Sequence, residues 1–362
     1  MSTGGPARAE LGAELRVDVH TGSSTYVVGS RQDRPNLPET TCPFCPGGRE
    51  APEPYDVRWF VNRWPAMPDD RCEVVLYTPE HDATFWSLGA DGARRVIDLW
   101  AERTAELGTR PDVDYVLVFE NRGPEVGATI AHPHGQIYAF DVVPELPSRE
   151  LARGTVFDEP GRRLVATAPG RRAVVPAAPI FPYALVLVPN APVADLPSLD
   201  AAGRDGIALL LVDVLERLDR LFDAQTPSML WIHQRPFDGG DWNGARLHVE
   251  IVAPCRAAEV PRFVAAGELG SGVFFNPVRG GGTVTPRGPA IAARPRGARR
   301  GDMSNSDMSP VRSDDMSVLD SRRAVTHALR RPRRITMSVS DLSPVRSGDM
   351  AFLDSGRGRA GR

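Results

Sequence analysis

Hydrophobic residues along the chain fall into short runs typical of strands and into two longer stretches with the spacing of an amphipathic helix. In the first part of the chain, the runs at 73–78, 115–119 and 136–140 predict strands. A predicted helix lies between the first two runs, and its apolar face carries Ala93, Val96, Ile97, Trp100 and Leu107. The order strand, helix, strand, strand predicts an antiparallel sheet with one helix packed against it.

The same order of elements returns in the second part of the chain. The runs at 184–188, 229–232 and 247–252 predict strands. The helix between the first two has an apolar face formed by Ile207, Leu210, Leu211, Val214, Leu218 and Leu221. We therefore predict an α+β fold of two tandem halves, residues 16–150 and residues 151–280. The repeat sets His134 opposite His248 and Gln136 opposite Glu250.

The remaining residues, 281–362, have a different composition that is dominated by Gly, Pro, Arg and Ser. The segments 307–321 and 341–355 resemble each other, but two copies are too few for a repeat architecture with its own core. Because the hydrophobic content is low, we predict a disordered tail and assign it no role.

Charge and composition narrow the classes of function. The 43 basic residues nearly balance the 46 acidic ones, so no nucleic-acid partner is indicated. Every basic residue of the Lys and Arg class is Arg, which excludes a lysyl-nucleotide intermediate. The N-terminal residues lack a basic segment followed by an apolar run, and no apolar run is long enough to cross a bilayer. We expect a cytoplasmic protein without a membrane partner.

The most informative run is 132–136, which reads His-Pro-His-Gly-Gln. On a strand, His132, His134 and Gln136 would share one face, and polar side chains on a core face need partners. The preceding segment, 119–130, contains glycines that let backbone amides approach phosphate oxygens closely. A histidine beside such a loop is suited to attack phosphorus. The alternative is a pair of structural histidines.

The segments 119–123 and 132–137, together with Gly127 and Thr129, resemble the signature of the galactose-1-phosphate uridylyltransferases in the histidine-triad superfamily. The resemblance extends from about residue 31 to residue 263. It implies two histidine-triad-like halves, which accounts for the repeat. It also implies a homodimer and a double displacement, in which a histidine takes UMP from a nucleotide sugar, UDP-glucose, and passes it to a hexose 1-phosphate, galactose 1-phosphate.

By this resemblance, His134 matches the nucleophile and Gln136 matches a glutamine that hydrogen-bonds the phosphoryl oxygens. Hydrolases of the superfamily carry a third histidine at the position of Gln136. A neutral amide cannot serve there as a general acid or base. The resemblance therefore favours a transferase over a hydrolase.

The resemblance also implies a set of substrate-binding residues: Arg31, Arg34, Asn62, Asn121, Gly127, Thr129, Gln136, Arg262 and Phe263. Two departures leave the substrate open. Arg63 stands where well-known members have an aspartate, and the segment 268–277 replaces the family's hexose-recognising residues. That segment resembles members that handle ADP-glucose, so an adenylyltransferase or phosphorylase acting on ADP-sugars is the alternative. A non-catalytic nucleotide-binding zinc protein is a third hypothesis.

A metal site is indicated first by the spacing of Cys42 and Cys45. In a chain without export signals, such a pair is more often a metal site than a disulfide. The resemblance completes the set with His81 and His132, and two thiolates with two imidazoles suit structural zinc. The alternative is a reduced cysteine pair without a metal.

A second set matches another metal site of the family: Glu150, His233, His248 and Glu250. The family has a histidine at the position of Glu250. Two carboxylates and two imidazoles can still hold Fe or Zn as a second metal. The alternative is an empty site with its charged groups paired.

Overall fold

The computed structural model describes residues 13–29, 31, 41–154 and 163–278 of the chain. The predicted disordered tail at 281–362 and the candidate residue Arg34 lie outside the described residues. All described residues belong to one compact unit.

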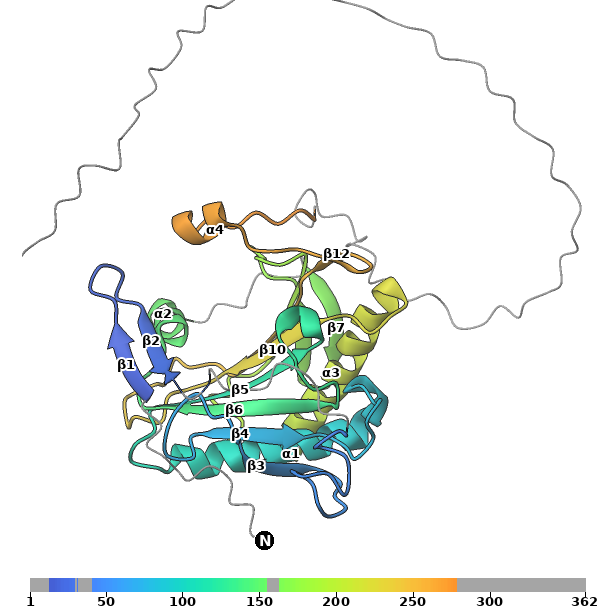
Figure 1. Ribbon diagram of the computed structural model, residues 1–362. Helices are drawn as coiled ribbons and strands as arrows, with labels where there is room; N and C mark the ends of the chain where they lie inside the picture. The colour runs from blue at the N-terminus through green and yellow to red at the C-terminus, as the bar shows by residue number, and fades with distance from the viewer. Residues whose placement is uncertain (1–12, 30, 32–40, 155–162, 279–362) are drawn as a thin grey trace, which may run out of the picture. The chain divides into compact units, whose positions relative to one another are not determined.

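Nine strands in the described part of the chain form one sheet, in the order β3-β4-β6-β5-β10-β11-β9-β8-β7 (Figure 1). The strands are β3 (Arg58–Val61), β4 (Cys72–Leu76), β5 (Tyr115–Arg122), β6 (His134–Phe140), β7 (Leu164–Ala168), β8 (Arg171–Val174), β9 (Tyr183–Pro189), β10 (Ser228–His233) and β11 (His248–Ala253). All neighbours pair antiparallel. The predicted α+β fold is confirmed, but the sheets of the two halves are continuous, because β5 pairs with β10.

The strand register repeats about the junction of β5 with β10. Gln136 on β6 pairs with Phe119 on β5, and Glu250 on β11 pairs with Trp231 on β10. Phe119 and Trp231 in turn pair with each other across the junction. A two-fold operation that exchanges the halves therefore puts Gln136 on Glu250, the correspondence that the repeat in the sequence predicts.

Two long helices, α1 (Gly89–Gly108) and α3 (Ala201–Phe222), pack side by side on one face of the sheet (Figure 1). The apolar residues predicted for the two helix faces are buried there, except Leu221, which is half-buried. The carboxylate of Asp200 caps the start of α3 by accepting a 2.7 Å hydrogen bond from the backbone N–H of Gly203. We call this face of the sheet the helix face and the opposite one the site face.

The smaller elements surround the sheet. They are the hairpin of β1 (Ala13–Val17) and β2 (Ser24–Val28), the pair β12 (Cys255–Ala257) and β13 (Val260–Pro261), the helices α2 (Glu145–Arg153) and α4 (Ala266–Ser271), and the 3-10 turns η2 (Trp86–Leu88) and η3 (Pro124–Val126). The boundary predicted between residues 150 and 151 falls within α2, and the division into two domains stays a prediction. Among the described residues, no helix is both long and apolar enough to span a membrane.

One ion pair is buried where α1 meets β4. Arg103 donates two hydrogen bonds to Glu73, of 2.6 Å from Nη2 and 2.9 Å from Nε. Their side chains are 4% and 2% exposed. The Arg103 guanidinium also lies 3.5 Å from the centre of the Trp59 ring. Loss of one partner would leave the other charge buried without compensation, which is costly.

We expect Arg103→Ala to lower the free energy of unfolding by about 3–5 kcal/mol. The matched control is Arg220→Ala, which removes an exposed pair with Glu216 and should cost less than about 0.5 kcal/mol. Urea unfolding of both variants measures the difference. Equal losses of unfolding free energy in the two variants would show that the buried pair contributes no more than the exposed one.

Candidate active site

Strand β6 begins at His134, and its alternate residues His134 and Gln136 lie together on the site face. The expected alternation does not extend to His132, which precedes the strand and is fully buried. Pro133 separates the two histidines and has no N–H to donate to a neighbouring strand. The two histidines therefore lie in different environments: His132 is in the interior, and His134 is on the site face.

The His134 ring is held by its own backbone. Its Nδ1 lies 2.7 Å from the carbonyl oxygen of His132, an acceptor, so Nδ1 carries the proton. In the neutral imidazole the lone pair then belongs to Nε2. The ring edge also packs against Phe44, with 5.1 Å between ring centres. Backbone and aromatic contacts thus hold the ring in an orientation that leaves the lone pair on Nε2.

His248 has the same arrangement in the second half. Its Nδ1 lies 2.8 Å from the carbonyl oxygen of Arg246, again two residues earlier. Its Nε2 consequently carries the lone pair and lies 3.6 Å from Glu250 Oε1. The two halves present an imidazole in the same way, with different chemical surroundings.

Gln136 is oriented from the neighbouring β3–β4 connection. The amide nitrogen of Asn62 lies 3.5 Å from Gln136 Oε1, and Asn62 is fixed by a 2.9 Å hydrogen bond from the backbone N–H of Trp64. With Oε1 as acceptor, Gln136 has its amide N–H groups to offer to a phosphoryl oxygen.

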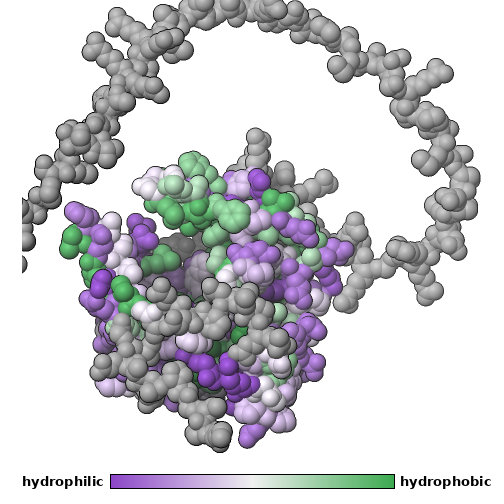
Figure 2. Space-filling view, in the orientation of Figure 1, coloured by the Kyte–Doolittle hydropathy of each residue, from purple (hydrophilic) through white to green (hydrophobic). Residues whose placement is uncertain are grey.

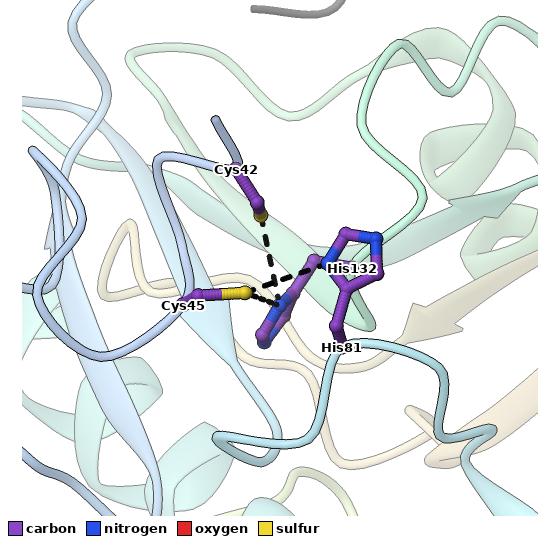
Figure 3. A group of neighbouring side chains, drawn as sticks. All are labelled: Cys42, Cys45, His81 and His132. Carbon is purple, nitrogen blue, oxygen red and sulfur yellow. Dashed lines mark hydrogen bonds between the residues drawn. The ribbon is translucent and has the colours of Figure 1, made fainter. Parts of the chain in front are cut away.

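The predicted zinc ligands converge. One ligand atom from each of Cys42, Cys45, His81 and His132 lies within 4.8 Å of the others (Figure 3). Nδ1 of His132 lies 3.8 Å from Cys42 Sγ and 3.6 Å from Cys45 Sγ, while Nδ1 of His81 lies 3.5 Å from Cys45 Sγ. Tetrahedral zinc with usual bond lengths requires about 3.6 Å between sulfur and nitrogen ligands. The donor atoms and their spacing therefore fit this ion.

The surroundings of His132 also suit a metal ligand. Its Nε2 lies 2.8 Å from the carbonyl oxygen of Thr78, which accepts a hydrogen bond from Nε2–H and leaves Nδ1 facing the sulfurs. The hydroxyl of Tyr55 lies 3.0 Å from the same Nε2. Burial lowers the pKa of His132, which favours the neutral imidazole that metal binding needs.

The second predicted set also converges, from α2, β10 and β11. One ligand atom from each of Glu150, His233, His248 and Glu250 lies within 4.8 Å of the others. Nδ1 of His233 lies 2.7 Å from Glu150 Oε2, and both histidines are about nine-tenths buried or more. The set has the chemistry of a cation site, because two carboxylates and two imidazoles face one centre.

The loop after β5 carries the predicted phosphate-binding residues. Asn121 lies near the end of β5, and Gly127 has a left-handed φ of 87° that side chains disfavour. The loop begins at Arg122, whose Nη2 donates a 2.7 Å hydrogen bond to the buried carboxylate of Asp219. The same carboxylate oxygen accepts a 2.7 Å hydrogen bond from the indole of Trp86. This anchor was missed from the sequence, because its partners are 97 residues apart.

Three other predicted substrate-binding residues, Arg31, Arg262 and Phe263, do not form one cluster. Arg31 lies 3.5 Å from the hydroxyl of Tyr138, which follows Gln136 on the site face of β6. Arg262 is buried and paired with Glu268, and Phe263 is 78% exposed. The charge of Arg262 thus already has a partner in the C-terminal segment, and roles for this pair in substrate binding stay predictions.

Other residues near the site were not foreseen. Phe119 and Trp231 lie side by side in register between Gln136 and Glu250, on the site face. Glu120, the next residue along β5, turns to the helix face and is 9% exposed. An alternating apolar pattern would have shown the site-face aromatics only if the strand boundaries had been known.

Solved structures share this fold. A uridylyltransferase structure matches with a TM-score of 0.66 and 26% identity, over 73% of this chain and 94% of that one. An ADP-glucose phosphorylase from Arabidopsis thaliana matches with a TM-score of 0.58 and 21% identity, over 73% and 95% of the chains, a likeness of fold alone. The class is therefore defined: the chain has a uridylyltransferase fold.

Sequence comparisons define the family. The model of the galactose-1-phosphate uridyl transferase N-terminal domain matches residues 63–144. The galactose-1-phosphate uridylyltransferase of Streptomyces lividans is 39% identical, over 69% of this chain and 80% of the relative. That of Thermotoga maritima is 32% identical, over 73% of this chain and 94% of the relative. The chain belongs to the galactose-1-phosphate uridylyltransferase family.

The buried Glu120 generates a testable pH dependence. Burial raises the pKa of Glu120 to about 7, although Arg122 and Tyr77 act to lower it. Between the pKa of Glu120 in the unfolded chain and about 7, the folded chain binds more protons than the unfolded chain. The free energy of unfolding therefore falls as the pH rises, and this loss is complete above about pH 7.

We expect this loss to be roughly 3 kcal/mol between pH ~4.5 and pH ~7. Glu120→Gln, which cannot ionise, should remove that part of the pH dependence. Urea unfolding of both proteins across this range measures it. Parallel curves for the two proteins would show that Glu120 keeps an ordinary pKa.

Proposed function

We propose that the chain transfers UMP from UDP-glucose to galactose 1-phosphate by double displacement. In the first step, Nε2 of His134 attacks the α-phosphorus, the bond from phosphorus to the bridging oxygen breaks, and glucose 1-phosphate leaves with the bonding electrons. In the second step, a phosphate oxygen of galactose 1-phosphate attacks the uridylyl group and the phosphorus–nitrogen bond breaks. The observation that carries the proposal is the 2.7 Å contact of His134 Nδ1 with the His132 carbonyl, since it reserves Nε2 for the attack.

Gln136 supports the same chemistry. Its amide N–H groups would donate to the non-bridging oxygens of the phosphoryl group, where negative charge develops during attack. An amide there does not deliver or remove protons at neutral pH. The uridylyl group on His134 is therefore left for a phosphate nucleophile instead of being hydrolysed with the help of a third histidine.

We propose that the substrates are held by the residues that match the family pattern: Arg31, Arg34, Asn62, Asn121, Gly127, Thr129, Gln136, Arg262 and Phe263. Three observations support parts of this set. Asn62 lies against Gln136, Gly127 gives the loop after β5 its left-handed turn, and Arg31 reaches the site-face residue Tyr138.

We propose that Cys42, Cys45, His81 and His132 bind structural zinc. The ion would cross-link chain segments that are distant in the sequence, and its ligands would take no part in moving protons. Support comes from the sulfur–nitrogen distances of 3.5, 3.6 and 3.8 Å. The ligand loop also carries Phe44, which packs on the His134 ring. Zinc would thus stiffen the wall of the nucleophile's site.

We propose that Glu150, His233, His248 and Glu250 bind a second metal, Fe or Zn, with a structural role. The transfer reaction needs neither electron transfer nor a further Lewis acid at this position. The supporting observation is the convergence of four ligand atoms within 4.8 Å.

We also propose a homodimer that works in the cytoplasm. Exposed hydrophobic residues gather over the α4 region (Figure 2). Phe263, Leu269 and Phe275 there are 78%, 72% and 69% exposed, the kind of surface that an interface covers. None of the four cysteines forms a disulfide, as expected in a reducing compartment.

The central test is the mass of the protein after mixing with UDP-glucose alone. We expect a gain equal to one UMP, released again by galactose 1-phosphate, because the first displacement leaves the nucleotide on His134. His134→Asn should show no gain. The matched control is His20→Asn, an exposed histidine in the turn between β1 and β2, which should gain UMP like the unaltered protein.

Two outcomes would contradict the proposal. A protein that stays unmodified after mixing with UDP-glucose alone would exclude the covalent step. A gain of AMP from ADP-glucose in place of UMP would establish the adenylyl-transferring alternative instead.

Zinc has its own test by elemental analysis. We expect Cys45→Ser to contain about one zinc ion per chain fewer than the unaltered protein, together with a lower thermal midpoint. The matched control Cys72→Ala removes a buried thiol outside the ligand set and should keep the zinc. Equal zinc contents in the two variants would assign the ion to another site.

A further inference from the structure

Two polar groups are buried behind the nucleophile, on the helix face of the sheet. Tyr77 is 2% exposed and Glu120 is 9% exposed. Glu120 follows Phe119, the last β5 residue paired with β6, and so lies opposite Gly135. Among the described residues, neither the Tyr77 hydroxyl nor Glu120 Oε2 has a hydrogen-bond partner of good geometry. Such groups are costly to bury, and their presence calls for an explanation.

Gly135 links these groups to the active site, because it stands between His134 and Gln136. A Cβ at this position would overlap the Tyr77 hydroxyl and would lie 3.1 Å from the carbonyl oxygen of Phe119. The hydroxyl therefore packs directly on the backbone that carries both site residues. The backbone N–H of Tyr77 also donates a 3.3 Å hydrogen bond to the carbonyl oxygen of Pro133.

The two buried groups act on each other. Burial raises the pKa of Tyr77, and Glu120 raises it further. Burial raises the pKa of Glu120 to about 7, so a large share of molecules carry a neutral carboxyl near neutral pH. A neutral carboxyl can donate as well as accept a hydrogen bond, which lets it pair with a hydroxyl.

The second half of the chain provides an internal comparison. The register that matches Gln136 with Glu250 also matches Gly135 with Val249, Glu120 with Ile232 and Tyr77 with Pro189. Ile232 and Val249 are paired and fully apolar. The same position in the same fold is thus stable without a carboxyl, a hydroxyl or a glycine. The polar group of residues occurs in the half that contains His134.

We propose that Tyr77 and Glu120 are positioning residues, which brace Gly135 from the helix face and thereby fix the directions in which His134 and Gln136 project. This inference rests on the proposed function of His134. The brace acts through the backbone, because a shift of residue 135 would move the His134 ring and the Gln136 amide together. Misplacement of reacting groups by about 1 Å can slow a reaction about 100-fold.

The test replaces Glu120 by isoleucine, the residue type of its counterpart Ile232. It thereby separates an effect on stability from an effect on the positions of His134 and Gln136. We expect Glu120→Ile to leave the thermal midpoint unchanged or raise it, since a buried polar group is replaced by an apolar one. The rate of UMP attachment to the protein should nevertheless fall about 10-fold to 100-fold, with the KM for UDP-glucose little changed. Tyr77→Phe should slow attachment similarly.

Glu120→Gln is the conservative variant and should keep the rate within about threefold, because its amide has the shape and hydrogen-bonding capacity of the neutral carboxyl. The double variant Tyr77→Phe with Glu120→Ile should be no slower than the slower single variant, as for groups that act as one unit. Ile232→Val is the matched control in the second half and should attach UMP at the normal rate.

A second readout needs no substrate. Nitrogen-15 NMR of labelled histidines should show His134 as a single tautomer protonated at Nδ1 in the unaltered protein and in Ile232→Val. In Glu120→Ile and Tyr77→Phe a mixture of tautomers is expected. Normal rates and an unchanged His134 signal in both variants would overturn the positioning role. Failure of the unaltered protein to take up UMP would instead refute the proposed function, and the NMR result would then decide the positioning role alone.

Discussion

The antiparallel pairing of β5 with β10 is the constraint on which the rest of the structure depends. It joins two half-sheets into one surface and sets Phe119 against Trp231 at the junction. The helices can then cover one face continuously, which leaves the other face for chemistry. On that face Gln136 and Glu250 lie three strand spacings apart, or about 14 Å. His134, beside Gln136, and the cluster that contains Glu250 therefore lie on the same sheet surface without touching each other.

On this sheet, the same hydrogen bond to the backbone orients one histidine in each half. His134 and His248 both direct Nδ1 to the carbonyl oxygen two residues earlier, at 2.7 and 2.8 Å. The neighbours of Nε2 then decide the chemistry. Beside Glu150 and Glu250 the imidazole suits a cation, and beside an amide and a glycine-containing loop it suits phosphorus. The same backbone arrangement thus presents the two imidazoles to different neighbours.

Much of this arrangement could be predicted from the sequence. The helices and strands depend on apolar spacing, which is local, and the repeat gave the correspondence of Gln136 with Glu250. The ligand sets followed from residue types matched to a family pattern, and the structure brings both sets together.

Other features depend on contacts between distant residues. The joined sheet required knowledge of which strand edges meet, and the anchor of Arg122 on Asp219 joins residues 97 positions apart. Glu120 sits in a polar run that resembles a solvent-exposed strand end, and its burial is imposed by other strands. His132 does not share the strand face predicted for it, because Pro133 interrupts the strand.

Nε2 of His134 is the atom that we propose to take the nucleotide. The most direct measurement is the structure of the protein trapped after reaction with UDP-glucose, supported by phosphorus NMR of the same intermediate. The predicted result is a phosphorus–nitrogen bond to Nε2 of His134, with Nδ1 still donating to the His132 carbonyl. A nucleotide on Nδ1, or on any other side chain, would contradict the account.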